Sequence, residues 1–126
     1  MLIVDTDILI DAARNDKLAK QFIAAAEKSG DVYISAITQM ELLVGARNKA
    51  ELQEITNFIQ RFVILTIDQF ITVEAVQLLT KYRLSFGLAI ADALIAATAK
   101  TIGYSLATKN RKDFHYISDL QLADYP

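Results

Sequence analysis

Two acidic residues of this chain stand where apolar neighbours predict burial. Asp5 directly follows residues 2–4, a short apolar run that predicts a buried parallel strand. Glu41 lies one helical turn from Ile37 and Val44, so we expect it to share a face with buried side chains. A lone buried carboxylate costs several kcal/mol unless a base, a proton or a metal neutralises it. Each acid also has a simpler interpretation: Asp5 as a turn residue bonded to its own backbone, and Glu41 as half of a salt bridge.

Two further acids belong to the same set. Asp92 lies in a strongly apolar segment and is the only charged residue between Arg83 and Lys100. Its alternative role is a helix N-cap, which aspartate favours and where the helix dipole stabilises an anion. Asp113 lies in a polar loop after residues 105–107, a predicted strand whose end belongs to the binding edge of a parallel sheet. Its alternative role is that of an ordinary loop residue.

The chemistry that these acids predict is metal-dependent hydrolysis of a phosphodiester. Like charges brought together raise one another's pKa values and destabilise a fold, and a divalent cation removes that cost. The chain has no cysteine and a single histidine, His115, which excludes thiolate and multi-histidine sites. Oxygen ligands remain, and they favour Mg²⁺ or Mn²⁺. Such ions activate water and stabilise an in-line phosphodiester displacement, so no protein nucleophile is required.

The composition is typical of one domain over residues 1–126. An apolar fraction of 53% is high for a small domain and predicts an apolar surface covered by a partner or by a second copy. A net charge of −2 means that binding of nucleic acid must rest on local basic groups or a metal. No apolar run approaches the roughly 20 residues of a membrane span. Asp5 and Asp7 interrupt any signal peptide, and we expect a cytoplasmic protein without contact to a membrane.

Strands and helices are expected to alternate along the chain. Short apolar runs predict strands at residues 2–4, 32–34, 63–67 and 105–107, with a last one near 116–117. Periodic or apolar segments predict helices at residues 18–28, 36–46, 49–62, 69–84 and 89–101, and a further helix that begins near Ile8 with Asp7 as its cap. Ser35 and Asp68 are the expected caps of two others. This alternation predicts an α/β fold in three layers, with a mainly parallel sheet between helices.

Four segments resemble, in order and spacing, the acidic motifs of PIN-domain proteins. They are residues 4–11 (VDTDILID), 35–46 (SAITQMELLVGA), 89–99 (AIADALIAATA) and 108–114 (TKNRKDF). The resemblance covers essentially the whole chain. The order, spacing and length are similar to those of the VapC toxins of bacterial and archaeal toxin–antitoxin pairs.

The resemblance implies a PIN-like fold and an endoribonuclease that needs Mg²⁺ or Mn²⁺. It implies that Asp5, Glu41, Asp92 and Asp113 form the acidic site, with Asp5 and Asp92 as direct metal ligands. Glu41 and Asp113 bind directly, through water, or to a second ion. The resemblance also implies a homodimer, an RNA substrate with transfer RNA as the expected class, and a VapB-type antitoxin that covers the site.

Neighbours of the acids have supporting roles in this interpretation. Asp7 departs from the family pattern, where a small hydroxyl residue or Asn is more usual, and it is expected to cap a helix or to act in the outer shell of a metal. Thr6 and Thr108 are candidates to orient ligands or water, with a turn bonded to the backbone as the favoured alternative for Thr6. Either Asn110 or Asp113 completes the fourth motif.

Basic residues near the acidic motifs are candidates for contact with RNA phosphates. They are Arg47, Lys81, Arg83, Lys109 and Arg111. Each has the alternative role of a solvated surface charge. Tyr82 and Phe86 have two possible uses, stacking on bases and packing in the core, of which packing is favoured.

Two other classes of protein remain as alternatives. Asp5 and Asp7 after an apolar strand approximate the nucleophile motif of haloacid dehalogenase-type phosphatases, although Leu9 replaces the usual Thr or Val and Glu41 is left without a role. A non-catalytic receiver-like module would need a phosphorylatable Asp at the end of a middle strand, and acids on helices fit it poorly.

Overall fold

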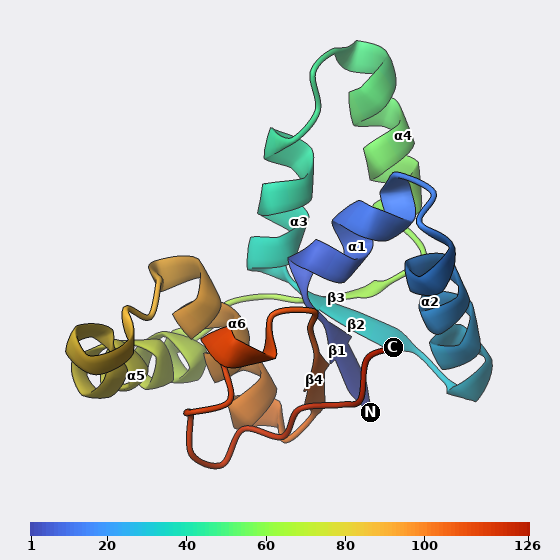
Figure 1. Cartoon of the computed structure of the whole chain (residues 1–126). Coiled ribbons are helices and arrows are strands. Elements are labelled where there is room, and N and C mark those ends of the chain that lie inside the picture. Colours follow the sequence, from blue (N-terminus) through green and yellow to red (C-terminus); the bar gives the residue numbers. More distant parts are fainter.

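The computed structural model describes residues 1–126 as helices packed around a small sheet (Figure 1). The elements in chain order are β1 (Leu2–Val4), α1 (Thr6–Ala13), α2 (Lys17–Ser29), β2 (Val32–Ser35), α3 (Ala36–Val44), α4 (Lys49–Ile59), β3 (Val63–Leu65), α5 (Gln69–Phe86), α6 (Ile90–Ile102), β4 (Ser105–Ala107) and a short 3-10 helix, η1 (Arg111–Asp113). The helices α3 and α4 extend together away from the sheet (Figure 1).

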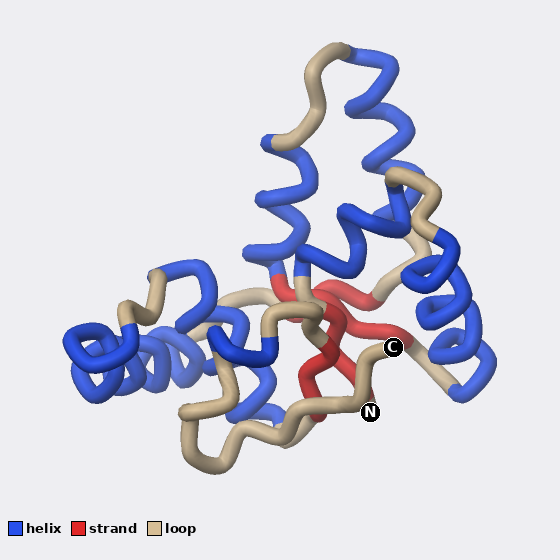
Figure 2. The backbone as a smooth tube through the Cα atoms, in the orientation of Figure 1, coloured by secondary structure: helices blue, strands red, loops and turns tan.

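The four strands form an all-parallel sheet in the order β3-β2-β1-β4. Ile3 pairs with Tyr33 on one side and with Leu106 on the other, and all three point to the same face of the sheet. Figure 2 shows the strands in the centre with helices on both sides. The predicted α/β fold with a parallel central sheet is confirmed.

The strand order creates a switch point between β1 and β4. The connections through α1, α2, α3 and α4 lead from β1 outward to β3, and their buried residues pack with Val4 and Ala107 on one face. The connection through α5 and α6 returns across the opposite face, with Ile3 and Leu106, and places β4 on the other side of β1. In open α/β sheets, ligands bind outside the carboxyl ends of the strands at such a point.

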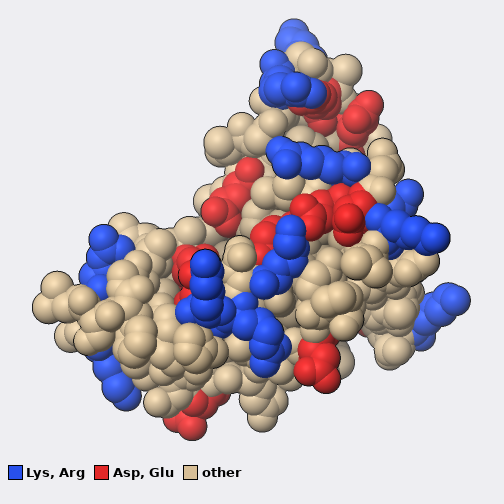
Figure 3. Space-filling model, in the orientation of Figure 1, with Lys and Arg blue, Asp and Glu red and all other residues tan.

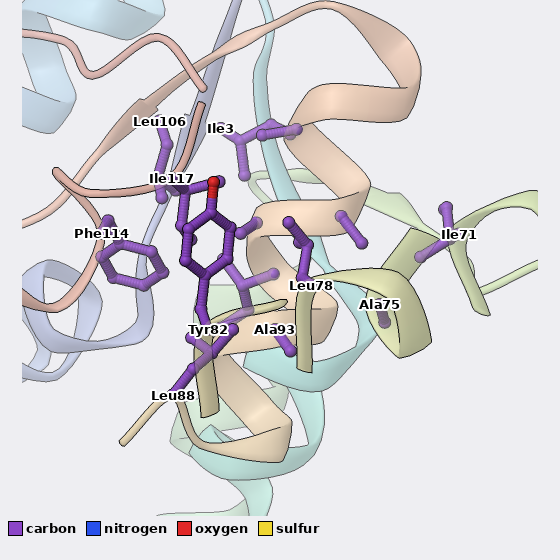
Figure 4. Packing of buried hydrophobic residues seen from close by; sticks show 14 residues of the cluster. Ile3, Ile71, Ala75, Leu78, Tyr82, Leu88, Ala93, Leu106, Phe114 and Ile117 are labelled. Atoms are coloured by element: carbon purple, nitrogen blue, oxygen red, sulfur yellow. The ribbon is translucent and has the colours of Figure 1, made fainter. Parts of the chain in front are cut away.

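The face under α5 and α6 holds the larger hydrophobic cluster, in which Leu78, Phe114 and Ile117 surround Tyr82 (Figure 4). The sheet-facing alanines of α6, among them Ala93 and Ala96, are fully buried. Because these side chains are small, the helix backbone can lie close to the strands. The apolar segment around Asp92 is therefore a buried helix that runs across the sheet.

Helix boundaries follow the local capping signals closely. Ser35 accepts a hydrogen bond from Ile37 N at 3.1 Å, and Asp68 accepts one from Ile71 N at 2.9 Å, so both predicted caps are confirmed. Gly87 has a φ of +73°, a left-handed conformation that suits glycine, and it ends α5 before the turn into α6.

Two local predictions were wrong. α1 begins at Thr6 and not near Ile8, because Asp5 itself has the extended backbone of an N-cap immediately after β1. Asp7 therefore lies inside the helix. The predicted strand near 116–117 does not form, because the chain turns there and Ile117 N donates to Phe114 O at 3.0 Å. Its apolar side chains fill the core beside β4 instead of joining the sheet.

Part of the apolar excess lies on the surface. Phe70, Val73 and Val76 are 57 to 66% exposed and follow one another along α5, and Val44 at the end of α3 is 86% exposed. None of the helices combines the length and the apolar character needed to cross a bilayer.

Candidate functional site

Asp5 is held firmly at the carboxyl end of β1. It is buried, and its backbone N donates to Ala107 O at 2.8 Å, which continues the pairing of β1 with β4. Its Oδ1 accepts a hydrogen bond from Thr6 N at 2.9 Å, and its Oδ2 accepts one from the Thr108 hydroxyl at 2.7 Å. The backbone-bonded interpretation of Asp5 is thus correct for one oxygen, while Thr108 fixes the direction of the other.

Asp7 holds the loop that follows β4. Its Oδ2 accepts hydrogen bonds from Asn110 Nδ2 at 2.9 Å and from Lys109 N at 3.2 Å. Lys109 Nζ forms an ion pair with Asp11 at 2.6 Å, which ties the same loop to α1 a second time. The side-chain amide of Asn110 is therefore occupied by its hydrogen bond to Asp7. Asp113, at the end of the 3-10 helix η1, is the member of the fourth motif whose carboxylate stays open.

Glu41 is not buried, although its apolar neighbours on the helix predicted burial. The residue is exposed, and so is Val44, because this part of α3 lies beyond the sheet. The salt-bridge alternative is also wrong, since no ion pair of the protein contains Glu41. Its Oε1 instead accepts a hydrogen bond from the Thr6 hydroxyl at 2.7 Å.

Thr38 completes this arrangement and was not anticipated from the sequence. Its hydroxyl is fully buried and lies 2.9 Å from the hydroxyl of Thr6. Because each hydroxyl has one proton, Thr38 donates to Thr6 while Thr6 donates to Glu41. Thr6 thus orients a carboxylate, and the alternative in which it stabilises a turn is wrong. The spacing of Thr38 and Glu41, three residues apart on one helix, was the available signal.

Asp92 lies in the first turn of α6 and has no partner. The N-cap of this helix is Ala89, so the cap alternative for Asp92 is wrong. The carboxylate is half-buried, and neither a hydrogen bond nor an ion pair contributes to its stabilisation. Only the dipole of α6, whose positive end is close, favours a charge at this position.

The electrostatics show that the acids share one site. Burial first, and then the charge of Asp7, raises the pKa of Asp5 to about 7, although its hydrogen bonds oppose the shift. Burial, followed by the charges of Asp113, Glu41 and Asp7, raises the pKa of Asp92 to about 6. Carboxylates influence each other in this way only when they lie close together in a poorly solvated place. The structure therefore brings together all four acids of the motifs, with Asp7 beside them.

The donor set suits a hard divalent cation. Its groups are carboxylate and hydroxyl oxygens, and the raised pKa values show that the ionised acids lack a compensating positive charge. No three of the acidic side chains are arranged as a ready-made cage around one point. Mg²⁺ does not need such a cage, since it usually keeps several waters and binds through one or two carboxylates.

Each of the predicted RNA-contacting residues already has a contact within the protein. Figure 3 shows acidic side chains gathered in the middle of one face, with lysine and arginine side chains around them. Arg47 pairs with Glu51 at 2.7 Å, Arg83 donates to Gly87 O at 2.9 Å, and Arg111 donates to Ala123 O at 2.9 Å. Lys81 lies over the ring of Tyr82.

A groove of about 920 Å³ runs between α1, α2, α3 and α4 and reaches Glu41. Apolar side chains such as Ile55 and Phe58 and basic ones such as Arg47 and Arg61 line it. The acidic site is thus continuous with a mixed apolar and charged groove.

A parallel α/β sheet with a group of oxygen ligands at its switch point defines the class of protein. The family follows from comparison with known proteins: residues 2–120 match the PIN domain, and the chain belongs to the PIN domain family. The resemblance predicted from the four motifs is confirmed.

The similar proteins include named ribonucleases. The chain is 32% identical over 122 residues to ribonuclease VapC10 of Mycobacterium tuberculosis, covering 96% of this chain and 91% of that protein. It is 37% identical over 131 residues to ribonuclease VapC1 of Rickettsia felis, covering 96% and 93%.

Solved structures agree with this relationship. A toxin–antitoxin complex from Klebsiella pneumoniae contains a chain with 34% identity and a TM-score of 0.77, with 95% of each chain covered. The VapBC2 complex of Rickettsia felis, bound to a DNA fragment from its promoter, gives 26% identity and a TM-score of 0.84, covering 99% of this chain and 98% of the other.

Proposed function

We propose that the protein is a Mg²⁺- or Mn²⁺-dependent endoribonuclease and the toxin of a VapBC-type toxin–antitoxin pair. The observation that carries the proposal is the convergence of Asp5, Glu41, Asp92 and Asp113 at the switch point of the sheet, with the pKa values of two of them raised and no base to neutralise them. Its support from relatives is that similar chains are named ribonucleases. Transfer RNA is the substrate class that the family resemblance implies.

Asp5, at the end of β1, and Asp92, in the first turn of α6, are the proposed direct ligands of the metal. Thr108 holds one oxygen of Asp5 in a fixed direction, and Thr6 does the same for Glu41. Such supporting hydrogen bonds orient ligands and tune their basicity. Asp113 influences Asp92 through its charge and is the proposed fourth ligand, directly or through water.

A divalent cation bound there would activate a water molecule and stabilise the charge that develops on a phosphodiester. The residues of the chain supply what the cation needs: carboxylates, of which that of Asp5 is buried, and a helix N-terminus that favours negative charge beside Asp92. The five basic residues predicted to contact RNA would place its backbone without reading its sequence.

An antitoxin that covers the acids and a homodimer of this chain complete the proposal. The groove between α1, α2, α3 and α4 begins at Glu41, so a protein segment seated in it would also reach the site. The exposed apolar side chains along α5 offer a surface for a second copy. The proposed location is the cytoplasm, where RNA is available.

The phosphatase alternative has lost its main support. That mechanism needs the second acid, Asp7, to transfer protons freely. Both oxygens of Asp7 accept hydrogen bonds from the protein, from Ile8 N on one side and from the loop after β4 on the other. Asp7 is therefore a positioning residue for that loop.

The test is cleavage of a purified transfer RNA mixture in Mg²⁺ or Mn²⁺, with and without EDTA. The proposal predicts cleavage that EDTA abolishes and that Asp92→Asn removes. Asp31→Asn is the matched control, because Asp31 is an exposed acid directly before β2. It therefore lies at the amino end of that strand, whereas the acidic site lies at the carboxyl ends of the strands. Cleavage that persists in EDTA, or equal cleavage by Asp92→Asn, would overturn the proposal.

A further inference from the structure

Two aromatic rings stack face to face beside the acidic site. Phe86 is the last residue of α5, and Tyr116 follows η1 by three residues. Their ring centroids are 4.1 Å apart and their planes differ by 4°. Parallel, offset stacking is one of the two arrangements that aromatic pairs favour in proteins, the other being edge-to-face contact. We call this pair the aromatic stack.

Tyr82 contacts the aromatic stack from the hydrophobic core. This residue is buried in the core cluster (Figure 4), and its ring meets the edge of Tyr116 with the centroids 5.2 Å apart. Its hydroxyl accepts a hydrogen bond from Ser118 N at 3.1 Å and lies 3.2 Å from Ser118 Oγ. Arg83 also donates to the backbone around Gly87, which fixes the end of α5. The rings are thus held in place before any ligand arrives.

The outer ring of the stack remains open. Phe86 is 55% exposed, whereas Tyr82 is only 7% exposed. Since one face of Phe86 rests on Tyr116, the exposed area belongs to its other face and its edges. The expectation that Phe86 packs in the core is therefore wrong, although it is correct for Tyr82. An aromatic face that is fixed in position and open to solvent can stack on a planar group of a ligand.

The stack lies within the electrostatic reach of the acids. Burial first, and then the charges of Asp92 and Asp113, raises the pKa of Tyr116. Tyr116 and Phe86 also flank these acids in the chain, three residues after Asp113 and six before Asp92. Tyr116, on which Phe86 rests, therefore lies near these acids, and a group stacked on Phe86 would lie one ring further from Tyr116.

We propose that the aromatic stack binds one nucleobase of the RNA next to the cleaved phosphate, with the base on the open face of Phe86. The inference rests on the proposed ribonuclease function and adds to it a residue that positions the substrate. Proteins hold single-stranded nucleic acid by combining aromatic faces with nearby cations. Here Lys81 lies 5.2 Å from the centre of the Tyr82 ring, and Arg83 is one turn before Gly87.

The experiment compares Phe86→Leu, which keeps an apolar side chain but loses the flat face, with Phe86→Trp, which restores it. Leu18→Ala is the control, because Leu18 is a 56% exposed apolar residue on α2, outside both the apolar surface along α5 and the groove. The substrate is a single-stranded RNA with 2-aminopurine at successive positions, and Mg²⁺ is present.

We expect Phe86→Leu to raise KM by about 5- to 150-fold with kcat unchanged, the range that loss of one base stack produces. The 2-aminopurine fluorescence quenched by wild type on rapid mixing, before cleavage, should be lost in Phe86→Leu and regained in Phe86→Trp. Leu18→Ala should behave as wild type in both measurements.

Each contrary result overturns the inference in a recognisable way. If wild type cleaves RNA and Phe86→Leu matches it in KM and quenching, the stack binds no base while the proposed function stands. If Phe86→Leu changes the molecular mass in solution and leaves KM unaltered, the stack is a contact between protein chains. If wild type neither binds nor cleaves RNA, the proposed function fails and the inference falls with it.

Discussion

Asp5 follows β1 and Asp92 lies on α6, and the surroundings of these two acids of the candidate site differ. Asp5 is buried and accepts hydrogen bonds from Thr6 N and Thr108, so both of its oxygens have fixed directions. Asp92 is half-buried on α6 and has no such partner. Burial is nevertheless the main cause of the raised pKa of both carboxyl groups.

The difference shows which part of the site the fold orients by itself. Hydrogen bonds from the protein hold the Asp5 side rigid, although burial still raises the pKa of Asp5 to about 7. The Asp92 side carries charge that nothing in the chain compensates, and under the proposed function a cation would compensate it. An uncompensated carboxylate lowers stability, and proteins tolerate this at functional sites.

The largest expected effect is the loss of activity in Asp92→Asn. Removing a group that stabilises the developing charge typically reduces kcat by 10²–10³-fold, and we expect a loss on the order of 10²-fold or more. Single-turnover cleavage of transfer RNA in saturating Mg²⁺ measures it. Asp31→Asn should remain within about two-fold of wild type, the range expected of a distant exposed acid. An Asp92→Asn variant with wild-type kcat would remove Asp92 from the site.

The next largest effect concerns Asp5 and the hydrogen bond that it accepts from Thr108. Thr108→Val keeps the shape of the side chain but removes the hydrogen bond to Asp5 Oδ2. Loss of such an orienting partner costs about 10- to 100-fold in metal affinity or activity. We expect the concentration of Mn²⁺ at half-maximal cleavage to rise by such a factor, while Thr108→Ser remains near wild type. If Thr108→Ser loses as much as Thr108→Val, packing and not the hydroxyl is what matters.

A third prediction is that Asp92→Asn stabilises the metal-free protein, whereas most substitutions destabilise a fold. Folding raises the pKa of Asp92 from 3.8 to about 6, so the folded protein disfavours its charge. Metal-free wild type should therefore lose stability as the pH rises from about 4 to about 6, because the folded state binds more protons there. Asp92→Asn should recover about 1 kcal/mol at about pH 8, a value reduced for solvent exposure, and nothing at about pH 3.

Urea unfolding in EDTA at both pH values measures this effect. Asp5→Asn should gain less than Asp92→Asn, because the amide cannot accept from both Thr6 N and Thr108. Equal gains would show that the hydrogen bonds of Asp5 contribute nothing to the contrast. A destabilised Asp92→Asn at high pH would show that its charge is compensated after all.

The smallest effect belongs to Glu41, which is exposed and held only by Thr6. Glu41→Gln should change the free energy of unfolding by no more than about 0.5 kcal/mol. Cleavage should fall by less than for Asp92→Asn and recover partly at higher Mn²⁺. A loss as large as that of Asp92→Asn would place Glu41 among the direct ligands.

Local sequence signals were enough for most of the fold. Apolar periodicity and helix caps such as Ser35 and Asp68 depend on residues close together in the sequence. These signals predicted the positions of the strands and helices. Asp5 and Asp92 stood out for the same reason, as acids in apolar surroundings. The capping role of Asp5 was missed because the strand and the helix follow each other without a spare residue.

The remainder depends on contacts between distant segments. The hydrogen bond from Asn110 to Asp7 joins residues 103 positions apart, and no local pattern contains it. Glu41 was expected to be buried because Val44 is apolar, yet Val44 is 86% exposed at the end of α3. Apolar periodicity does not distinguish a core face from a face kept for another molecule. The same ambiguity concealed the exposure of Phe86.

The central claim is that the Asp92 side of the site is completed by a divalent cation. Thermal unfolding of the protein at increasing Mn²⁺ tests it directly, because an ion that binds only the folded state stabilises it by RT ln(1 + L/Kd), where L is the concentration of the free ion. We expect Tm of wild type and Asp31→Asn to rise with the logarithm of the Mn²⁺ concentration once that concentration exceeds Kd, and Tm of Asp92→Asn to rise much less. A wild-type Tm that ignores Mn²⁺, or an equal rise in Asp92→Asn, would contradict it.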